Sequence, residues 1–167
     1  MTTPISRISG RRLTATLSIA LLGALMQPAI VLADTAAEIK AEIVNSNAYV
    51  RKNLKDMDTG VSSKGSLQFW SSGGLVQNVP ANSPVATYES FSLTPKHLQV
   101  VVIEEGKSAV AMYYAEGSFH EKGKKPVAHY MTRITEVYVK EGGKWKTRAA
   151  HYSPIAAGSG TNQTAID

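Results

Sequence analysis

Apolar and polar residues alternate through the last third of the chain, and this alternation predicts long β-strands. Three runs rich in Val, Tyr, Thr and Ala span residues 108–120, 126–139 and 144–154, and short turns rich in Gly and Lys separate them. Runs of similar length joined by short turns are typical of an antiparallel meander. A fourth run, 98–104, is expected to open the same sheet after a break at Pro95.

A different spacing predicts one helix ahead of these strands. From Thr35 to about Met57, apolar residues recur mostly at steps of three and four and form a stripe along one side of the helix. The stripe consists of Ile39, Ile43, Val44, Val50, Leu54 and Met57. Asp34 or Thr35 can cap the start of the helix, and residues 58–60 are expected to end it. A helix followed by long antiparallel strands predicts an α+β domain.

The stretch between the helix and the long strands is less regular. Residues 61–74 are rich in Ser and Gly and enclose the apolar residues of 67–70, while 86–91 suits either a short helix or a short strand. The sequence therefore leaves the secondary structure of this stretch open.

The first 33 residues resemble an export signal. Arg7, Arg11 and Arg12 precede an apolar stretch at 13–26, and small or β-branched residues lie just before Asp34. The apolar stretch is shorter than the roughly 20 residues that a membrane-spanning helix needs. We therefore predict a signal peptide at 1–33 and a single domain at 34–154, followed by a mobile tail at 155–167. The mature protein is expected to be periplasmic or secreted, with no membrane contact.

Removal of the signal changes the charge of the chain. The full chain has 18 basic and 13 acidic residues, and three of the basic residues lie in the signal, so the mature chain is nearly neutral. A nearly neutral domain does not predict nucleic-acid binding. The chain has no cysteine, which excludes disulfides, thiol chemistry and cysteine-based metal sites. The histidines lack the spacing of a metal site, and no cofactor is predicted.

Strict alternation sorts the strand residues by face but does not say which face is buried. In the second long strand, Met131, Arg133 and Thr135 share one face, and Ile134 and Glu136 share the other. In the last strand, alternation groups one set of five residues, Trp145, Thr147, Ala149, His151 and Ser153, opposite Arg148, Ala150 and Tyr152. Neither face is wholly apolar, so one of them is expected to bury polar groups or to pack against another subunit.

The end of the chain resembles the closing hairpin of the nuclear transport factor 2-like superfamily. The resemblance rests on Thr135-x-Val137, on Gly143-Lys144-Trp145 after the turn, and on His151-x-Ser153. This superfamily includes SnoaL-like polyketide cyclases, ketosteroid isomerases and the association domain of calcium/calmodulin-dependent protein kinase II. The resemblance implies a cone-shaped, cystatin-like α+β fold, in which a strongly curved antiparallel sheet wraps around the N-terminal helix. It also implies a pocket at the open end and dimers formed through the outer sheet face.

Several polar residues in the strands are candidates for a site. Arg133, flanked by apolar residues in a central strand, is expected to be buried, either binding a carboxylate or phosphate or forming an internal ion pair with Glu116. Glu116 is the strand carboxylate best placed for proton transfer, and His151 could act as a general base or as a structural hydrogen-bonding residue. Trp70, Tyr114 and Tyr152 could form an aromatic pocket wall or simply pack in the core.

These observations predict an exported, SnoaL-like domain that binds a small apolar or anionic organic ligand through Trp70, Tyr114, Arg133 and Tyr152, and that forms a homodimer. One alternative is a lyase or isomerase with Glu116 or His151 as the proton-transfer group. Another is an assembly domain that dimerises without a ligand. The sequence does not decide among these functions, because this superfold carries all of them.

Overall fold

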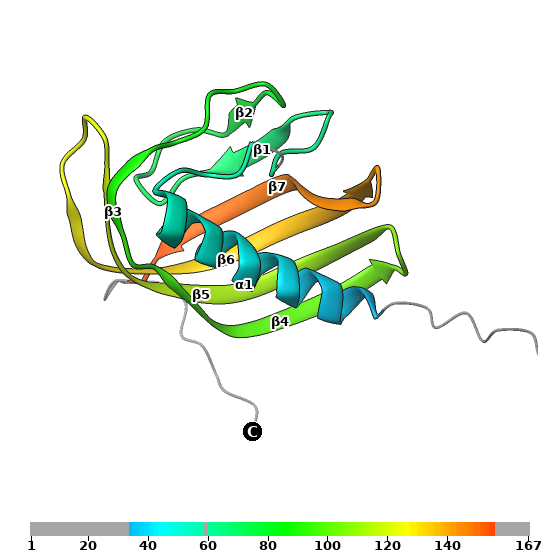
Figure 1. The fold of residues 1–167 in the computed structure, drawn as a ribbon. Helices are drawn as coiled ribbons and strands as arrows, with labels where there is room; N and C mark the ends of the chain where they lie inside the picture. Colours follow the sequence, from blue (N-terminus) through cyan, green and yellow to red (C-terminus); the bar gives the residue numbers. More distant parts are fainter. Residues whose placement is uncertain (1–33, 59, 156–167) are drawn as a thin grey trace, which may run out of the picture. The chain divides into compact units, whose positions relative to one another are not determined.

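A computed structural model describes residues 34–58 and 60–155, and the predicted signal peptide and nearly all of the predicted tail lie outside these residues. Within these described residues, one helix precedes a seven-stranded sheet (Figure 1). The elements are α1 (Thr35–Asn53), β1 (Ser66–Phe69), β2 (Gln77–Val79), β3 (Tyr88–Phe91), β4 (Thr94–Glu104), β5 (Ser108–Glu121), β6 (Val127–Glu141) and β7 (Lys144–Pro154). The predicted helix and the three long strands are confirmed.

The helix begins where the sequence predicts and ends earlier. The Asp34 carboxylate caps α1 by accepting the backbone N–H groups of Ala36 and Ala37 at 3.0 and 3.3 Å. At the other end Leu54 takes a left-handed conformation with φ of 50°, and its N–H donates to the Val50 carbonyl at 2.8 Å. The predicted end at 58–60 is therefore wrong, because the chain already turns at Leu54.

The sheet has the strand order β2-β1-β7-β6-β5-β3, and β4 also pairs with β5. All pairs are antiparallel except β1 with β7, which are parallel, so the sheet is mixed rather than purely antiparallel. The sheet does not close on itself. Residues 88–91, which the sequence left open, form a strand. The predicted break at Pro95 is wrong: Pro95 lies within β4, an edge strand, where a missing N–H is tolerated.

Helix α1 covers one face of the sheet, which we call the inner face; the opposite face is the outer face (Figure 1). Ile39 and Ile43 are almost completely buried against the inward residues of β5, β6 and β7, which are Ala109, Ala111, Tyr113, Ala115, Ile134, Tyr138 and Trp145. Glu38 anchors the start of the helix, because its Oε2 accepts from Lys140 Nζ at 2.6 Å and from Trp145 Nε1 at 2.7 Å. The inner face is therefore the core of the domain.

A β-bulge in the last strand changes the predicted grouping of its residues. Val137 pairs with Ala149 but Tyr138 pairs with Thr147, so Arg148 has no partner on β6. Arg148 instead donates to the carbonyl of Gly65 at 3.1 Å. Trp145 and Thr147 consequently share the inner face with Ala150 and Tyr152, while Ala149, His151 and Ser153 face outward. The prediction of a single alternating set through β7 is wrong because alternation shifts by one at a bulge.

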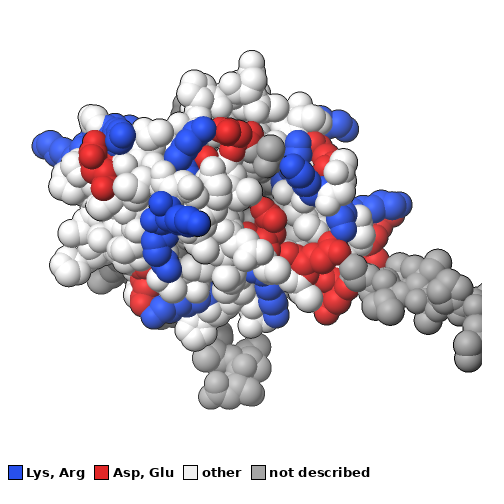
Figure 2. Space-filling model, in the orientation of Figure 1, with Lys and Arg blue, Asp and Glu red and all other residues white. Residues whose placement is uncertain are grey.

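Charged side chains of both signs are distributed over the helix-bearing side of the molecule (Figure 2). The described residues on this side form no continuous basic stripe of the kind typical of a nucleic-acid-binding surface. Within residues 34–58 and 60–155, no helix combines the length and the apolar character needed to cross a membrane.

Candidate functional site

A buried carboxylate with three tyrosine partners lies in the middle of the inner face. Glu136 on β6 is 7% exposed. Its Oε2 accepts the hydroxyl of Tyr138 at 2.7 Å and that of Tyr113 at 2.9 Å, and its Oε1 accepts the hydroxyl of Tyr152 at 3.1 Å. These contacts join β5, β6 and β7 side by side, so the cluster depends on the register of all three strands.

The environment keeps these tyrosines protonated. Burial raises the pKa of Tyr113, Tyr138 and Tyr152 well above 10, and the nearby Glu136 carboxylate adds to the rise in each case. Protonated hydroxyls remain hydrogen-bond donors at physiological pH. The three tyrosines therefore satisfy the Glu136 carboxylate, and they compensate the cost of its burial.

Tyr152 connects this cluster to a set of aromatic rings at one end of the sheet. Its ring stacks on Trp70 with centroids 5.4 Å apart and an angle of 13° between the planes. Tyr130 donates to Ser71 at 2.6 Å, directly after Trp70. Edge-to-face contacts continue from Tyr130 to Phe119, Tyr88 and Phe91. We call these six residues, Trp70, Tyr88, Phe91, Phe119, Tyr130 and Tyr152, the aromatic rim.

A second carboxyl group lies against the aromatic rim. Asp56, just after the end of α1, accepts the Tyr88 hydroxyl on both oxygens at 3.2 and 3.3 Å. Burial raises the pKa of Asp56 even though this hydrogen bond opposes the rise, and the charge of Glu121 raises it further. The Asp56 charge also contributes to the raised pKa of Tyr152. Asp56 and Glu136 therefore act electrostatically on the same part of the inner face.

The predicted site residues fall on two faces. Trp70 and Tyr152 come together in the aromatic rim. The other four, Tyr114, Glu116, Arg133 and His151, are absent from the rim and lie on the outward-facing positions of β5, β6 and β7. The structure thus brings the aromatic pair together and separates it from the predicted proton-transfer groups and from the predicted anion-binding residue.

On the outer face, Arg133 is exposed and not buried as expected. Its guanidinium donates to Ser153 Oγ at 3.0 Å. The expected ion pair with Glu116 is wrong, because Glu116 pairs with Lys96 on the neighbouring strand β4. His151 is exposed and packs edge-to-face on Phe69 at 5.6 Å. These side chains are solvated surface groups.

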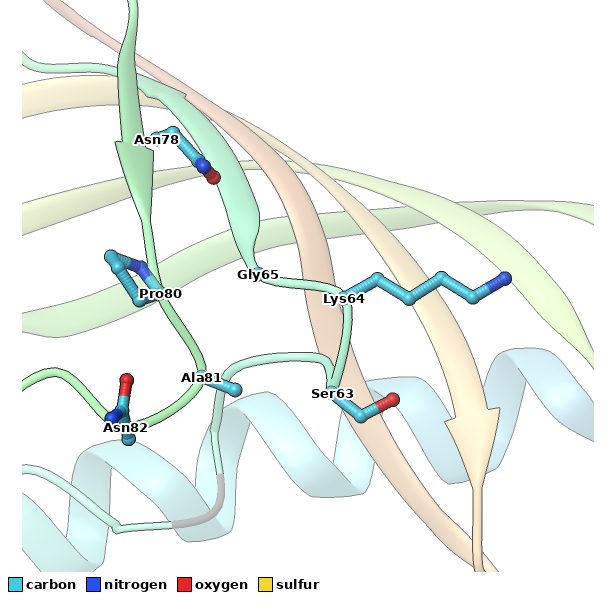
Figure 3. Close-up of a pocket in the computed structure, with 7 residues that line it drawn as sticks. All are labelled: Ser63, Lys64, Gly65, Asn78, Pro80, Ala81 and Asn82. Carbon is cyan, nitrogen blue, oxygen red and sulfur yellow. The ribbon is translucent and has the colours of Figure 1, made fainter.

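Two open depressions lie on the surface of the described residues. One, of about 700 Å³, is lined by Lys96, Glu116 and His129 and also by Tyr130 of the aromatic rim. The other lies next to the start of β1 and the end of β2 (Figure 3), with Lys64 pointing away from Asn78 and Pro80. A side chain at Gly65 would approach both Asn78 Oδ1 and the Val79 carbonyl to 3.0 Å, so a glycine is needed there. Both depressions are shallow and solvated.

The loop beside this second depression is held by an acidic residue. Glu141 accepts the Ser62 hydroxyl at 2.7 Å and the Ser63 N–H at 2.8 Å, and these bonds lower the pKa of Glu141 to about 2. Within the described part of the chain, no group of three metal-ligating side chains comes together.

Sequence reasoning singled out Tyr152 but not Glu136, Asp56 or the other two partner tyrosines, Tyr113 and Tyr138. Alternation did place Glu136 on the same face as Ile134 and opposite Arg133, and this assignment is confirmed. A carboxylate on the face of Ile134 and within one strand of several tyrosines was the available signal. Asp56 gave no such signal, because its contact with Tyr88 spans 32 residues of sequence.

A scan against protein-family models finds no match, and no curated protein is similar in sequence. Among solved structures, the chain is similar to a protein from Exiguobacterium sibiricum described as a calcium/calmodulin-dependent kinase II association domain. The two are 13% identical, with a TM-score of 0.51 over 73% of this chain and 94% of that one. A nuclear transport factor 2-like protein of unknown function from Prochlorococcus is 14% identical, with a TM-score of 0.49 over 75% and 96% of the two chains.

A protein with a cystatin-like fold from Caulobacter vibrioides is 12% identical, with a TM-score of 0.46 over 72% and 86% of the two chains. At these identities the likeness concerns the fold. The chain shares its fold with the association-domain structure at the TM-score of 0.51, and the α+β fold that the sequence resemblance implied is confirmed.

Proposed function

We propose that this chain is an exported domain that binds a small organic molecule at the aromatic rim. The observation that carries the proposal is the Trp70–Tyr152 stack. Trp70 is 43% exposed, while the ring beneath it is tied to the buried Glu136 through the Tyr152 hydroxyl. A rigid, partly exposed aromatic surface binds planar apolar groups at low entropic cost. The basic and apolar N-terminal sequence supports export.

The site favours a ligand different from the anion that the sequence suggested. Arg133, the residue expected to bind an anion, lies on the outer face. The aromatic rim instead contacts Asp56 and is linked to Glu136 through Tyr152, and two carboxyl groups disfavour an anionic ligand. The proposed ligand is therefore apolar over most of its surface and not negatively charged.

The test is native mass spectrometry of the full chain expressed in a host that processes its N-terminal segment. A co-purifying small molecule is expected on the wild-type protein and is expected to be lost from Trp70→Ala. Phe69→Ala is the matched control, because Phe69 is similarly exposed and adjacent in sequence but faces outward. Equal retention by both variants, or loss from both, would contradict binding at the aromatic rim.

An enzymatic role would involve different residues from those the sequence suggested. Glu116 and His151 lie on the outer face, away from the aromatic rim. Asp56 is the carboxyl group that contacts the rim, and its raised pKa is the property expected of a group that exchanges a proton near neutral pH. If the bound molecule is converted, Asp56→Asn should abolish turnover and retain binding, whereas Glu116→Gln should change neither.

A second candidate function is assembly of two copies through the outer face. Large apolar side chains are exposed there on three adjacent strands, namely Val101 and Ile103 on β4, Met112 and Tyr114 on β5, and Met131 on β6. Contiguous exposed apolar surface on a soluble domain commonly marks a contact with another protein. One solved structure of the same fold is described as an association domain, which supports this candidate. Assembly and ligand binding use opposite faces and are compatible.

A further inference from the structure

A buried amide with an unsatisfied oxygen lies next to the aromatic rim. Gln68 on β1 is 5% exposed. Its Nε2 donates to Ser66 Oγ at 3.1 Å, and its Oε1 has no hydrogen-bond partner. A buried acceptor without a donor costs about 1–3 kcal/mol. Such groups are rare in folded proteins, and each calls for a specific explanation.

The register of the strands places Gln68 next to the Trp70–Tyr152 stack. On β1, Ser66 and Gln68 face inward while Leu67 and Phe69 face outward. Two residues after Gln68 comes Trp70, whose ring stacks on the inward-facing Tyr152. Gln68 and Trp70 therefore occupy successive inward-facing positions, and Tyr152 lies beside them on β7.

Gln68 belongs to a row of paired residues that crosses three neighbouring strands and reaches Glu136. Gln68 pairs with Ala150 on β7, and Ala150 pairs with Glu136 on β6. Two strand spacings separate the backbones of Gln68 and Glu136 by roughly 10 Å. The residue between them contributes only a methyl group. The Glu136 carboxylate already accepts three hydroxyls, so the Gln68 oxygen is the unfilled acceptor of this row.

We infer that Gln68 Oε1 accepts a hydrogen bond from the ligand, and that the ligand is a neutral molecule with a planar apolar body and one O–H or N–H donor at its end. This inference rests on the proposed function. The planar body would lie against Trp70 and Tyr152, with its donor directed to Gln68. A neutral donor suits this acceptor because Gln68 and Ser66 carry no charge and the Glu136 carboxylate already accepts three hydroxyls. An ammonium group at Gln68 would therefore lose its hydration without forming a direct ion pair.

The specificity of such a site follows from the buried amide. A site built to hydrogen-bond a donor discriminates strongly against an analogue that lacks the donor, because the acceptor is again left unpaired. The apolar contacts to the rings, in contrast, contribute equally to both analogues. Gln68 is therefore assigned to specificity, and Trp70 to affinity for the planar body.

The test uses three naphthalene probes and isothermal titration calorimetry on the full chain. 2-Naphthol offers an O–H donor, 2-methoxynaphthalene has the same rings without a donor, and 2-naphthoate is an anion. The wild-type protein is expected to bind 2-naphthol about tenfold more tightly than 2-methoxynaphthalene, and 2-naphthoate more weakly than either. In Gln68→Met the preference for 2-naphthol should disappear, while Trp70→Ala should weaken both neutral probes alike.

Gln77→Met is the matched control, because Gln77 pairs with Gln68 across β1 and β2 but is exposed. It should retain the wild-type preference. The comparison of the two neutral probes needs only the wild-type protein, so it stands even if Gln68→Met fails to fold.

Equal binding of the two neutral probes to the wild type, together with weaker binding of both by Trp70→Ala, would overturn the role of Gln68 and leave the proposed function intact. Tighter binding of 2-methoxynaphthalene would also overturn it, since the amide would then present a donor. Binding of neither probe would contradict the proposed function itself, and the inference would fall with it.

Discussion

Glu136 holds the inner face together, because three buried hydroxyls from three strands depend on its carboxylate. Glu136→Ala would leave those hydroxyls without an acceptor and is expected to lower the free energy of unfolding by roughly 3–5 kcal/mol. Glu136→Gln retains one oxygen and should cost less, about 1–2 kcal/mol. Denaturant titration of the full chain measures both losses.

The control for Glu136 is Glu89→Ala, which removes an exposed carboxylate from β3. Its effect should stay within about 0.5 kcal/mol. A loss in Glu136→Ala no larger than that of this control would mean that the tyrosine cluster does not stabilise the sheet.

Asp56 should make the stability of the protein depend on pH. Because burial raises its pKa in the folded state, the folded protein favours the protonated carboxyl, and stability is lost as the pH rises through that value. Asp56→Asn keeps an acceptor for the Tyr88 hydroxyl without the charge. It should raise the Tm by about 2–4 °C at neutral pH, and the gain should vanish near pH 3, where the wild-type carboxyl is protonated.

Calorimetric scans of the wild type and Asp56→Asn between pH 3 and pH 8 would test this. Asp58→Asn is the control, because Asp58 is exposed and bonded to Lys55, and it should bring no such gain. A constant difference in Tm between Asp56→Asn and the wild type at all pH values would show that the effect is not electrostatic.

Helix α1 contributes to stability mainly through its buried side. Ile43 is almost fully buried against the sheet, whereas its neighbour Val44 is 50% exposed. Ile43→Ala should therefore lower the free energy of unfolding by about 2–4 kcal/mol, from lost burial and from the cavity it leaves. Val44→Ala, on the same helix, should cost less than about 0.5 kcal/mol. Denaturant titrations of the two variants would measure the difference, and similar losses would mean that α1 is only loosely packed on the inner face.

In the last strand, the sequence predicts where the strand begins and ends but not which face each residue occupies. The run 144–154 is apparent from its composition, and β7 follows it closely. The bulge at Arg148 is not apparent, because the bond that accompanies it joins Arg148 to Gly65, 83 residues earlier. A bulge reverses the face of every later residue in the strand. For this reason Tyr152 lies on the same face of the sheet as Trp145, where it belongs to the aromatic rim, and not on the opposite face.

For the protein as a whole, the exposed apolar outer face predicts a dimer. Met112, 51% exposed in the middle of β5, would lie within such an interface. Met112→Lys should weaken dimerisation at least about tenfold, because a charge would be buried without a partner. Sedimentation velocity of the full chain at several concentrations would measure the change.

The control for the dimer is Val44→Lys, which introduces the same charge on an equally exposed residue of α1, on the other side of the sheet. It should leave the dimer intact. A wild-type protein that stays monomeric at about 100 μM, or dissociation caused equally by both variants, would contradict assembly through the outer face.

The sequence alone determined the helix, the three long strands and their order. Helical and strand periodicities are local properties, so α1, β5, β6 and β7 could be read from the chain, and the resemblance of the closing hairpin implied the fold. The two aromatic residues of the stack, Trp70 and Tyr152, were also identified as candidates. The other four predicted residues were chosen by residue type, and type does not say which face a side chain occupies.

Only the tertiary structure decided which side chains meet. Glu136 contacts Tyr113 and Tyr152 through the register of three strands, and Asp56 meets Tyr88 where the chain leaves α1. Gln68 lies beside the stack because β1 pairs in parallel with β7. These contacts depend on pairings between distant segments, on one bulge and on one left-handed residue at Leu54. A shift of one residue in any strand would reverse its faces, so the site is a property of the assembled sheet.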